Sequence, residues 1–223
     1  SVEESSILDA TDCLVQGNRE LGIYVSSSSA TLQGVEILDT QPNVTGQGGR
    51  GLQVQDSTLE VTDSLLQGNH EVGLLVDNST ATLQGVEALD TQPGITGKGG
   101  HGVAVQDSTL VATDCLVQGN HDIGLYVDMS TATLQGVEVL DTRRNAVGSA
   151  AVGIVSQEES TVIATNLTVR DTDGPALTVA VDAVLECSNG TLTDNTFAGA
   201  LVQLGGALVL EESVIEGTLP GSS

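Results

Sequence analysis

The sequence predicts an all-β chain wound as a solenoid of about nine coils, with three short strands in each coil. The segment DSTLEVTDSLLQGNHEVGLLVD (56–77) returns almost unchanged at 107–128, which is 51 positions later. Apolar residues alternate with polar ones over short stretches that Asp, Asn or Gly interrupt, and this period is that of a strand. Ala, Val, Thr and Gly dominate these stretches, and they pleat better than they form helices.

Each repeating unit divides into a short coil of about 22 residues and a long coil of about 29 residues. Strands of successive coils should pair in parallel ~4.8 Å apart, so nine coils predict a rod roughly 40 Å long. Further copies of the repeat lie at 10–25, 29–55, 79–106 and 130–157, and less regular coils follow at 162–172, 185–195 and 208–218.

Within each strand, alternate side chains are expected to point into an aliphatic core. We expect Val61, Leu83 and Val111 to stack in one internal file. Cys13 and Cys115 share an inward position four coils apart, or roughly 19 Å, whereas a disulfide needs Cα atoms within about 7 Å. The sequence therefore predicts small buried thiols at Cys13, Cys115 and Cys187.

One column of the predicted coil holds only Asn and Thr. These residues can bond to the backbone and to one another where the chain bends, so the column predicts a polar ladder at a corner of the coil. Its members are Asn18, Thr40, Asn69, Thr91, Asn120, Thr142, Thr172, Asn195 and Thr218.

The next column contains His70 and His121, each of which precedes a carboxylate in the phrases GNHEVGLLV and GNHDIGLYV. The two histidines lie two coils apart, so roughly 9–10 Å separates their backbones. A shared zinc ion would need their nitrogens within about 3–4 Å. Gln92 lies between them, and the first copy has Arg19 in their place. The sequence therefore predicts structural or surface roles for both histidines.

Every second coil carries a longer loop, at 41–51, 92–102 and 143–153. Pro and paired Gly in these loops indicate tight turns. We expect the loops to project from one edge as a ridge that forms the interaction surface of an otherwise acidic rod. The predicted ligand-binding residues on it are Arg50, Lys98, His101, Arg143 and Arg144.

The repeat resembles the right-handed parallel β-helix of the pectate-lyase-like superfamily, and the resemblance covers essentially the whole chain. The phrase G-N-x-x-x-G-[LI]-x-V, at 68–76 and 119–127, is similar to the N-x-x-x-G-[IL] repeat of carbohydrate-binding and sugar-hydrolase β-helices. The resemblance implies a single-stranded right-handed β-helix. It also implies that loops like these three border a substrate groove in the enzymes of the superfamily.

A polysaccharide-active enzyme (lyase, hydrolase or epimerase) with a site near 92–102 and 143–153 is the alternative. GGHG at 99–102 resembles the glycine–histidine–glycine element of polygalacturonases, which implies His101, but their Asp-Asp and Arg-Ile-Lys elements are missing. Inverting hydrolysis needs two carboxyls about 6.5–9.5 Å apart. We assign no catalytic residue, and the candidates for this alternative are His101, Asp90 (with Asp39 or Asp141 of its column), Asp141 and Arg143, which with Arg144 is similar to the arginine base of pectate lyases.

Composition narrows the classes of function. Thirty acidic residues against six basic ones give a formal charge of −24, which disfavours nucleic acid and anionic lipid as partners. No apolar run reaches the ~18–20 residues of a membrane span. The aromatic residues are Tyr24, Tyr126 and Phe197. We predict a non-catalytic extracellular or cell-surface scaffold, an adhesion or interaction module that binds polysaccharide or another surface protein.

We expect residues 1–223 to form one β-helix domain. The chain begins at Ser1 rather than Met, which suggests a segment of a longer secreted protein. No cap precedes Val2, so further coils upstream or edge-to-edge self-association at the N-terminal coil are expected. No cofactor or metal is predicted; calcium is the alternative, and it would raise the melting temperature.

Overall fold

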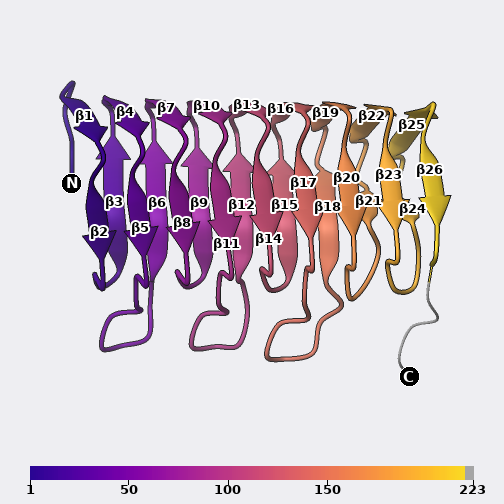
Figure 1. Ribbon diagram of the computed structural model, residues 1–223, viewed down its shortest axis with the longest axis horizontal. Coiled ribbons are helices and arrows are strands. Elements are labelled where there is room, and N and C mark those ends of the chain that lie inside the picture. The colour runs from indigo at the N-terminus through magenta and orange to yellow at the C-terminus, as the bar shows by residue number, and fades with distance from the viewer. Residues whose placement is uncertain (219–223) are drawn as a thin grey trace.

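The computed structural model describes residues 1–218, which form 26 strands and no helix. The strands make three sheets that run side by side along one rod, with β1 and β26 at opposite ends (Figure 1). Each coil contributes one strand to each sheet, except that sheet 3 has eight strands where the others have nine. The prediction of an all-β parallel coil of about nine turns is confirmed.

The strand bounds follow the repeat. Sheet 1 contains β1 (Ile7–Thr11), β4 (Ser29–Gln33), β7 (Thr58–Thr62), β10 (Thr80–Gln84), β13 (Thr109–Thr113), β16 (Thr131–Gln135), β19 (Thr161–Thr165), β22 (Val184–Ser188) and β25 (Ala207–Glu211). Sheet 2 contains β2 (Leu14–Gln16), β5 (Glu36–Leu38), β8 (Leu65–Gln67), β11 (Glu87–Leu89), β14 (Leu116–Gln118), β17 (Glu138–Leu140), β20 (Thr168–Arg170), β23 (Thr191–Thr193) and β26 (Val214–Glu216). Sheet 3 contains β3 (Leu21–Ser26), β6 (Arg50–Gln55), β9 (Val72–Asp77), β12 (His101–Gln106), β15 (Ile123–Asp128), β18 (Val152–Gln157), β21 (Leu177–Val179) and β24 (Ala200–Val202).

Coil length alternates as the repeat predicts over the first coils. The strands of sheet 1 begin 22, 29, 22, 29, 22, 30, 23 and 23 residues apart. The three long coils are those whose loops follow β5, β11 and β17, and these loops project from the same edge of the rod (Figure 1). The ridge of loops is therefore present. The last two coils are both short, so the alternation ends after β19.

Neighbouring strands pair in parallel and in register. Val61 of β7 lies beside Leu83 of β10, and Leu83 lies beside Ala112 of β13. The predicted file is therefore correct for Val61 and Leu83 and wrong for Val111, which is 38% exposed on the outer face. Side chains alternate between the two faces of a strand, so an error of one residue exchanges inside for outside.

The core is aliphatic and continuous from Val25 to Leu192. Leu and Val side chains buried in this way each stabilise the fold by about 1.5–3 kcal/mol. Cys115 and Cys187 are buried free thiols, as predicted, but Cys13 is exposed. The reason is its place in the first coil, whose strands β1 and β2 lie at the edges of their sheets and have a neighbour on one side only.

The predicted corner ladder forms at Asn69, Asn120 and Asn195. The prediction is wrong for the threonines of the column, because the hydroxyls of Thr40, Thr91, Thr142 and Thr172 are buried and make no hydrogen bond with any described residue. Asn69 accepts a hydrogen bond at Oδ1 from the backbone N–H of Thr40 (3.0 Å) and donates through Nδ2 to the carbonyl of Ile37 (2.9 Å). Asn120 repeats both bonds two coils further on, and Asn195 does so near the C-terminal end. Each asparagine thereby bonds two backbone groups of the preceding coil, and one of them is a buried N–H that lies beyond the end of the sheet 2 strand.

A second ladder, of serines, lies at the turn from sheet 3 into sheet 1, and it is not among the columns predicted from the sequence. Each hydroxyl accepts a hydrogen bond from the backbone N–H of the serine one coil earlier; the Ser79 N–H, for example, donates to Ser108 Oγ at 2.9 Å. The sequence signal is the serine that stands just before each of these strands of sheet 1. The ladder runs through Ser28, Ser57, Ser79, Ser108, Ser130 and Ser160.

Within residues 1–218, no helix is long and apolar enough to cross a membrane.

Candidate functional site

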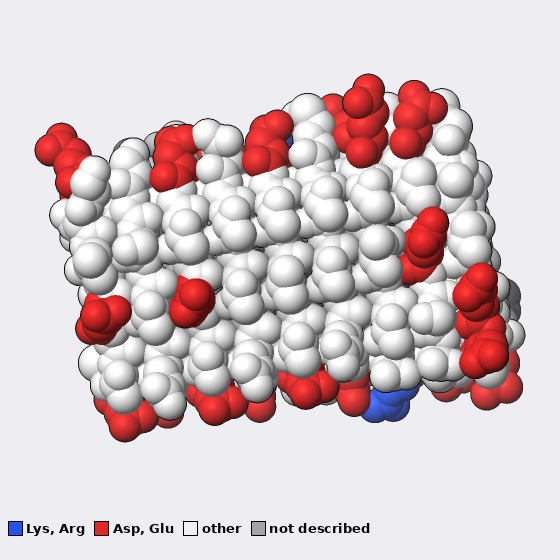
Figure 2. Space-filling model, turned by 90° about the horizontal axis from the view of Figure 1, so that it is seen from above, with Lys and Arg blue, Asp and Glu red and all other residues white. Residues whose placement is uncertain are grey.

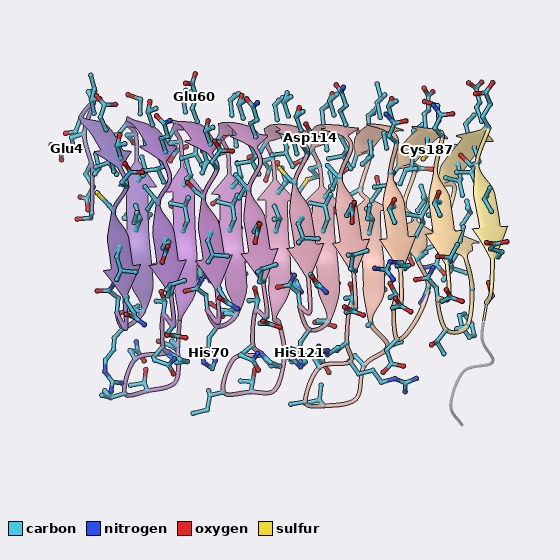
Figure 3. The ribbon with its side chains drawn as sticks, in the orientation of Figure 1. Glu4, Glu60, His70, Asp114, His121 and Cys187 are labelled. Carbon is cyan, nitrogen blue, oxygen red and sulfur yellow. The ribbon has the colours of Figure 1, made fainter. Side chains whose placement is uncertain are left out.

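The loop ridge (residues 41–51, 92–102 and 143–153) lies beside the N-terminal ends of the sheet 3 strands that follow each loop. His70 and His121 lie near the bases of these loops and are separated along the rod axis (Figure 3). His70 Nδ1 lies 3.2 Å from the carbonyl of Pro93, and His121 Nδ1 lies 3.1 Å from the carbonyl of Thr91. Each ring therefore contacts backbone of the corner, and the two rings do not share a ligand site.

The first residue of β6 and that of β12 occupy the same place two coils apart, and each contacts a carboxylate of the following coil. Arg50 Nε lies 2.9 Å from Glu71 Oε2, and His101 Nε2 lies 3.5 Å from Asp122 Oδ2. Glu71 and Asp122 both have a left-handed backbone, with φ of 63° and 69°. The repeat therefore places a basic side chain beside a carboxylate twice along the same edge of sheet 3.

His101, Asp122, Tyr126 and Asn145 form one group, which we call the His101 cluster. The rings of His101 and Tyr126 lie 5.7 Å apart between centroids. Burial raises the pKa of Asp122. Contacts with the side chains of His101 and Asn145 and with the backbone of Gly99 lower the pKa by more than burial raises it, so the pKa of Asp122 lies below its ordinary value. At neutral pH Asp122 is therefore a carboxylate held between two donors.

Replacing His101 with alanine is expected to raise the pKa of Asp122. The substitution removes the largest of the contacts that favour the charged form, while the burial that favours the neutral form remains. Because the native pKa lies below the unfolded one, the stabilising contribution of Asp122 is present above the unfolded pKa and is lost as pH falls through the native pKa. A carboxyl-detected NMR titration of both proteins measures the shift; an unchanged Asp122 pKa in His101→Ala would contradict the described contact.

Tyr126 extends the cluster onto the outer face of sheet 3. There it packs against Val72, Leu75 and Ala104, which are at most 8% exposed. Burial first, and then the charges of Asp128 and Glu158, raise the pKa of Tyr126 to about 12, so the phenol stays protonated at neutral pH. An aromatic ring over apolar side chains, with polar groups at its rim, is the composition of sites that bind small polar molecules.

Asp90 and Asp141 hold turns of the coil. Both have a left-handed backbone with φ of 53°. Asp90 Oδ2 accepts a hydrogen bond from Gln67 at 3.3 Å, and Asp141 Oδ2 accepts one from Gln118 at 2.7 Å. Asp39, their counterpart in the first long coil, accepts from Gln16 in the same way. The structure therefore gives each of these three carboxylates a structural partner in the preceding coil.

The remaining predicted ligand-binding residues lie on the second and third loops. Lys98 and Arg143 are exposed, while Arg144 Nε lies 3.1 Å from Asp173 Oδ2. The five residues are thus spread along the ridge, and three of them (Arg50, His101 and Arg144) each lie beside a carboxylate. The positive clustering expected from the sequence is largely neutralised by Glu71, Asp122 and Asp173, which the loop sequences do not contain.

A separate open groove of about 920 Å³ follows the serine ladder. It is lined by hydroxyls of both serine and threonine together with Asp56, Asn78 and Asp107. The groove lies at the turn into sheet 1, away from the loop ridge, so the groove and the predicted ligand-binding residues do not coincide. In the described part of the chain, no group of three or more His, Cys, Asp or Glu side chains is placed to hold a metal ion.

A family model described as right handed beta helix region matches residues 50–218. Among solved structures, ORF18 of Geobacillus virus E2 gives a TM-score of 0.44 at 10% identity, covering 97% of this chain and 52% of that one. The periplasmic alginate epimerase AlgG (as its D317A mutant) gives 0.42 at 11% identity, covering 96% and 76%. The Dettilon tailspike protein gives 0.41 at 10% identity, covering 97% and 56%. The chain spans about half the length of ORF18 and of the Dettilon tailspike protein. No curated protein matches the sequence.

Proposed function

The chain belongs to the right-handed β-helix family, and from that premise we propose that it is a non-catalytic extracellular scaffold whose loop ridge and adjacent face of sheet 3 bind polysaccharide. The His101 cluster and Arg50 supply the contacts, and Lys98, Arg143 and Arg144 extend them along the ridge. The parallel coil supplies a rigid support on which the repeated positions recur at regular intervals.

The single observation that supports a non-catalytic role is that the candidate acids are already engaged in holding turns of the coil. Asp90 and Asp141 each sit in a left-handed turn and accept a hydrogen bond from a glutamine of the preceding coil. A general acid or base needs a free path to a bound substrate and a pKa near the working pH. The pKa of Asp122 is instead held below its ordinary value by its neighbours.

The binding surface is supported by Tyr126 and its surroundings. Its ring lies over Leu75 and Ala104, and the hydroxyl accepts a hydrogen bond from Gln157 at 2.9 Å. A sugar ring presents an apolar face and a rim of hydroxyls, so it fits the Tyr126 ring with the polar side chain of His101 beside it.

Replacing Tyr126 with alanine is expected to weaken polysaccharide binding about tenfold, which corresponds to about 1.4 kcal/mol. Val209, which is 44% exposed on β25 of sheet 1 and therefore outside the proposed surface, is the control, and Val209→Ala should leave affinity unchanged. Affinity electrophoresis in a panel of neutral and acidic polysaccharides gives the affinities, and reducing-end and unsaturated-product assays on the same panel test for turnover. Turnover that disappears in His101→Ala would refute the scaffold and favour the enzyme.

A further inference from the structure

The outer face of sheet 1 carries no charge at its centre, although the chain has a net charge of −24. Seen from above, this face consists of parallel rows of uncharged side chains, with acidic residues along its margins and toward its ends (Figure 2). Glu60 on β7 and Glu186 on β22 bound the uncharged area along the rod. Between them lie β10, β13, β16 and β19.

Each of these four strands points three side chains outward, which gives three rows of four positions. Eight of the twelve are threonine: Thr80, Thr82, Thr109, Thr113, Thr131, Thr133, Thr161 and Thr165. The others are Gln84, Val111, Gln135 and Ile163. Val111 and Ile163 are 38% and 45% exposed, so the face presents methyl groups and hydroxyls to the solvent together.

The rows are regular in two directions. Each strand of the four pairs with its neighbour over all five residues without a bulge, so equivalent side chains stand in straight files. The files repeat at ~4.8 Å from strand to strand and at roughly 6.6 Å between outward positions along a strand. Threonine is branched at Cβ and therefore stiff at χ1, so its hydroxyl and methyl are held in place before any partner arrives.

We propose that this threonine face (the twelve outward positions of β10, β13, β16 and β19) binds ice. Water molecules on the low-index surfaces of hexagonal ice repeat with a spacing close to that between the strands. Ordered hydroxyls can hold waters at lattice positions, and the methyl groups between them exclude loosely bound solvent. A rigid solenoid keeps the whole array in place at little entropic cost.

Charge and aromatic content select this partner over others. A neutral lattice needs no countercharge, whereas polyanions would be repelled by the acidic margins and a cationic partner would find no carboxylate on the threonine face. A crystalline polysaccharide is a neutral lattice too, but its binding would use aromatic platforms, and none of the twelve positions is aromatic. The face lies on a different sheet from the polysaccharide site proposed above, so each proposal can fail without the other.

The test is the partition of the 223-residue chain into slowly growing ice, beside a co-dissolved inert protein. The wild-type chain should be enriched in the ice fraction. Thr133→Tyr, between Val111 and Ile163 in the middle row, should lose that enrichment because the ring breaks the flat file. Thr191→Tyr is the matched control on an exposed position of β23 in sheet 2, and it should partition like the wild type. Circular dichroism and melting temperature confirm that both variants are folded.

Four results would overturn the proposal. The first is a wild-type chain that is excluded from ice like the inert protein, and the second is a Thr133→Tyr variant that stays enriched. The third is a dimer that Thr133→Tyr dissociates without any ice enrichment of the wild type, which would make the face a contact between copies. The fourth is binding to crystalline cellulose or chitin that Thr133→Tyr abolishes while ice enrichment is absent.

Discussion

Replacing Asn120 with alanine is expected to lower the free energy of unfolding by about 3 kcal/mol. Asn120 is 1% exposed and bridges two coils: its Oδ1 accepts from the backbone N–H of Thr91 (2.9 Å), and its Nδ2 donates to the carbonyl of Ala88 (2.8 Å). Alanine leaves the Thr91 N–H buried without a partner, at a cost of about 1–3 kcal/mol, and also removes the side-chain bond to the Ala88 carbonyl, which lies in the ladder between β11 and β14. The loss exceeds that of an ordinary surface substitution because water cannot reach either group.

Thr91→Val is the matched control from the same column. The Thr91 hydroxyl is buried and makes no hydrogen bond with any described residue, so valine should leave stability unchanged or raise it by up to about 1 kcal/mol. Urea unfolding measures both variants, and hydrogen exchange at the Thr91 amide reports the corner itself. A decrease of less than about 1 kcal/mol in the free energy of unfolding of Asn120→Ala, or a Thr91 amide that exchanges freely in the wild type, would show that the asparagine ladder does not stabilise the corner of the coil.

The column of asparagines was predictable because the period of the coil, together with parallel pairing in register, determines which residues of successive coils lie next to one another. Once Asn69 and Asn120 are aligned through the repeat, their stacking with Thr40 and Thr91 follows without further information. Val111 shows the limit of this reasoning, since the same alignment shifted by one residue sends the side chain outward. Cys13 shows another, because its inward position in the repeat does not give burial in an end coil.

The site was less predictable than the fold. The sequence sets a carboxylate next to His121, yet the carboxylate Asp122 lies beside His101, which is 21 positions earlier. Loops that vary in composition decide which basic residue meets which acid, and the repeat says nothing about them. The positions of Glu71 and Asp122 in the repeat do carry a signal. Each carboxylate comes directly before the first residue of a sheet 3 strand, and the strand one coil earlier begins with Arg50 or His101.

Replacing Gly124 with alanine is also expected to lower the free energy of unfolding by about 3 kcal/mol. Gly124 is the last residue of the phrase GNHDIG (119–124), and its backbone is not in the left-handed conformation. A Cβ there would lie 2.7 Å from the carbonyl oxygen of Gly153 in the next coil and 2.4 Å from Cγ1 of Val139. The Gly153 backbone is held in the ladder of sheet 3 and cannot retreat, so the coils must separate locally. This explains why the phrase requires glycine four residues after its asparagine.

Gly94→Ala separates this steric effect from the general effect of removing a glycine. A Cβ on Gly94 would meet only the carbonyl oxygen of Lys98, at an ordinary 3.5 Å. Alanine there should be neutral or stabilise the fold by about 0.4–1 kcal/mol, because it restricts the unfolded chain. Urea unfolding of the two variants therefore should give opposite signs or a difference near 3 kcal/mol. Equal effects would mean that the coils are not packed backbone against backbone at this corner, and the close stacking that aligns the asparagine ladder with the sheet 3 strands would have to be abandoned.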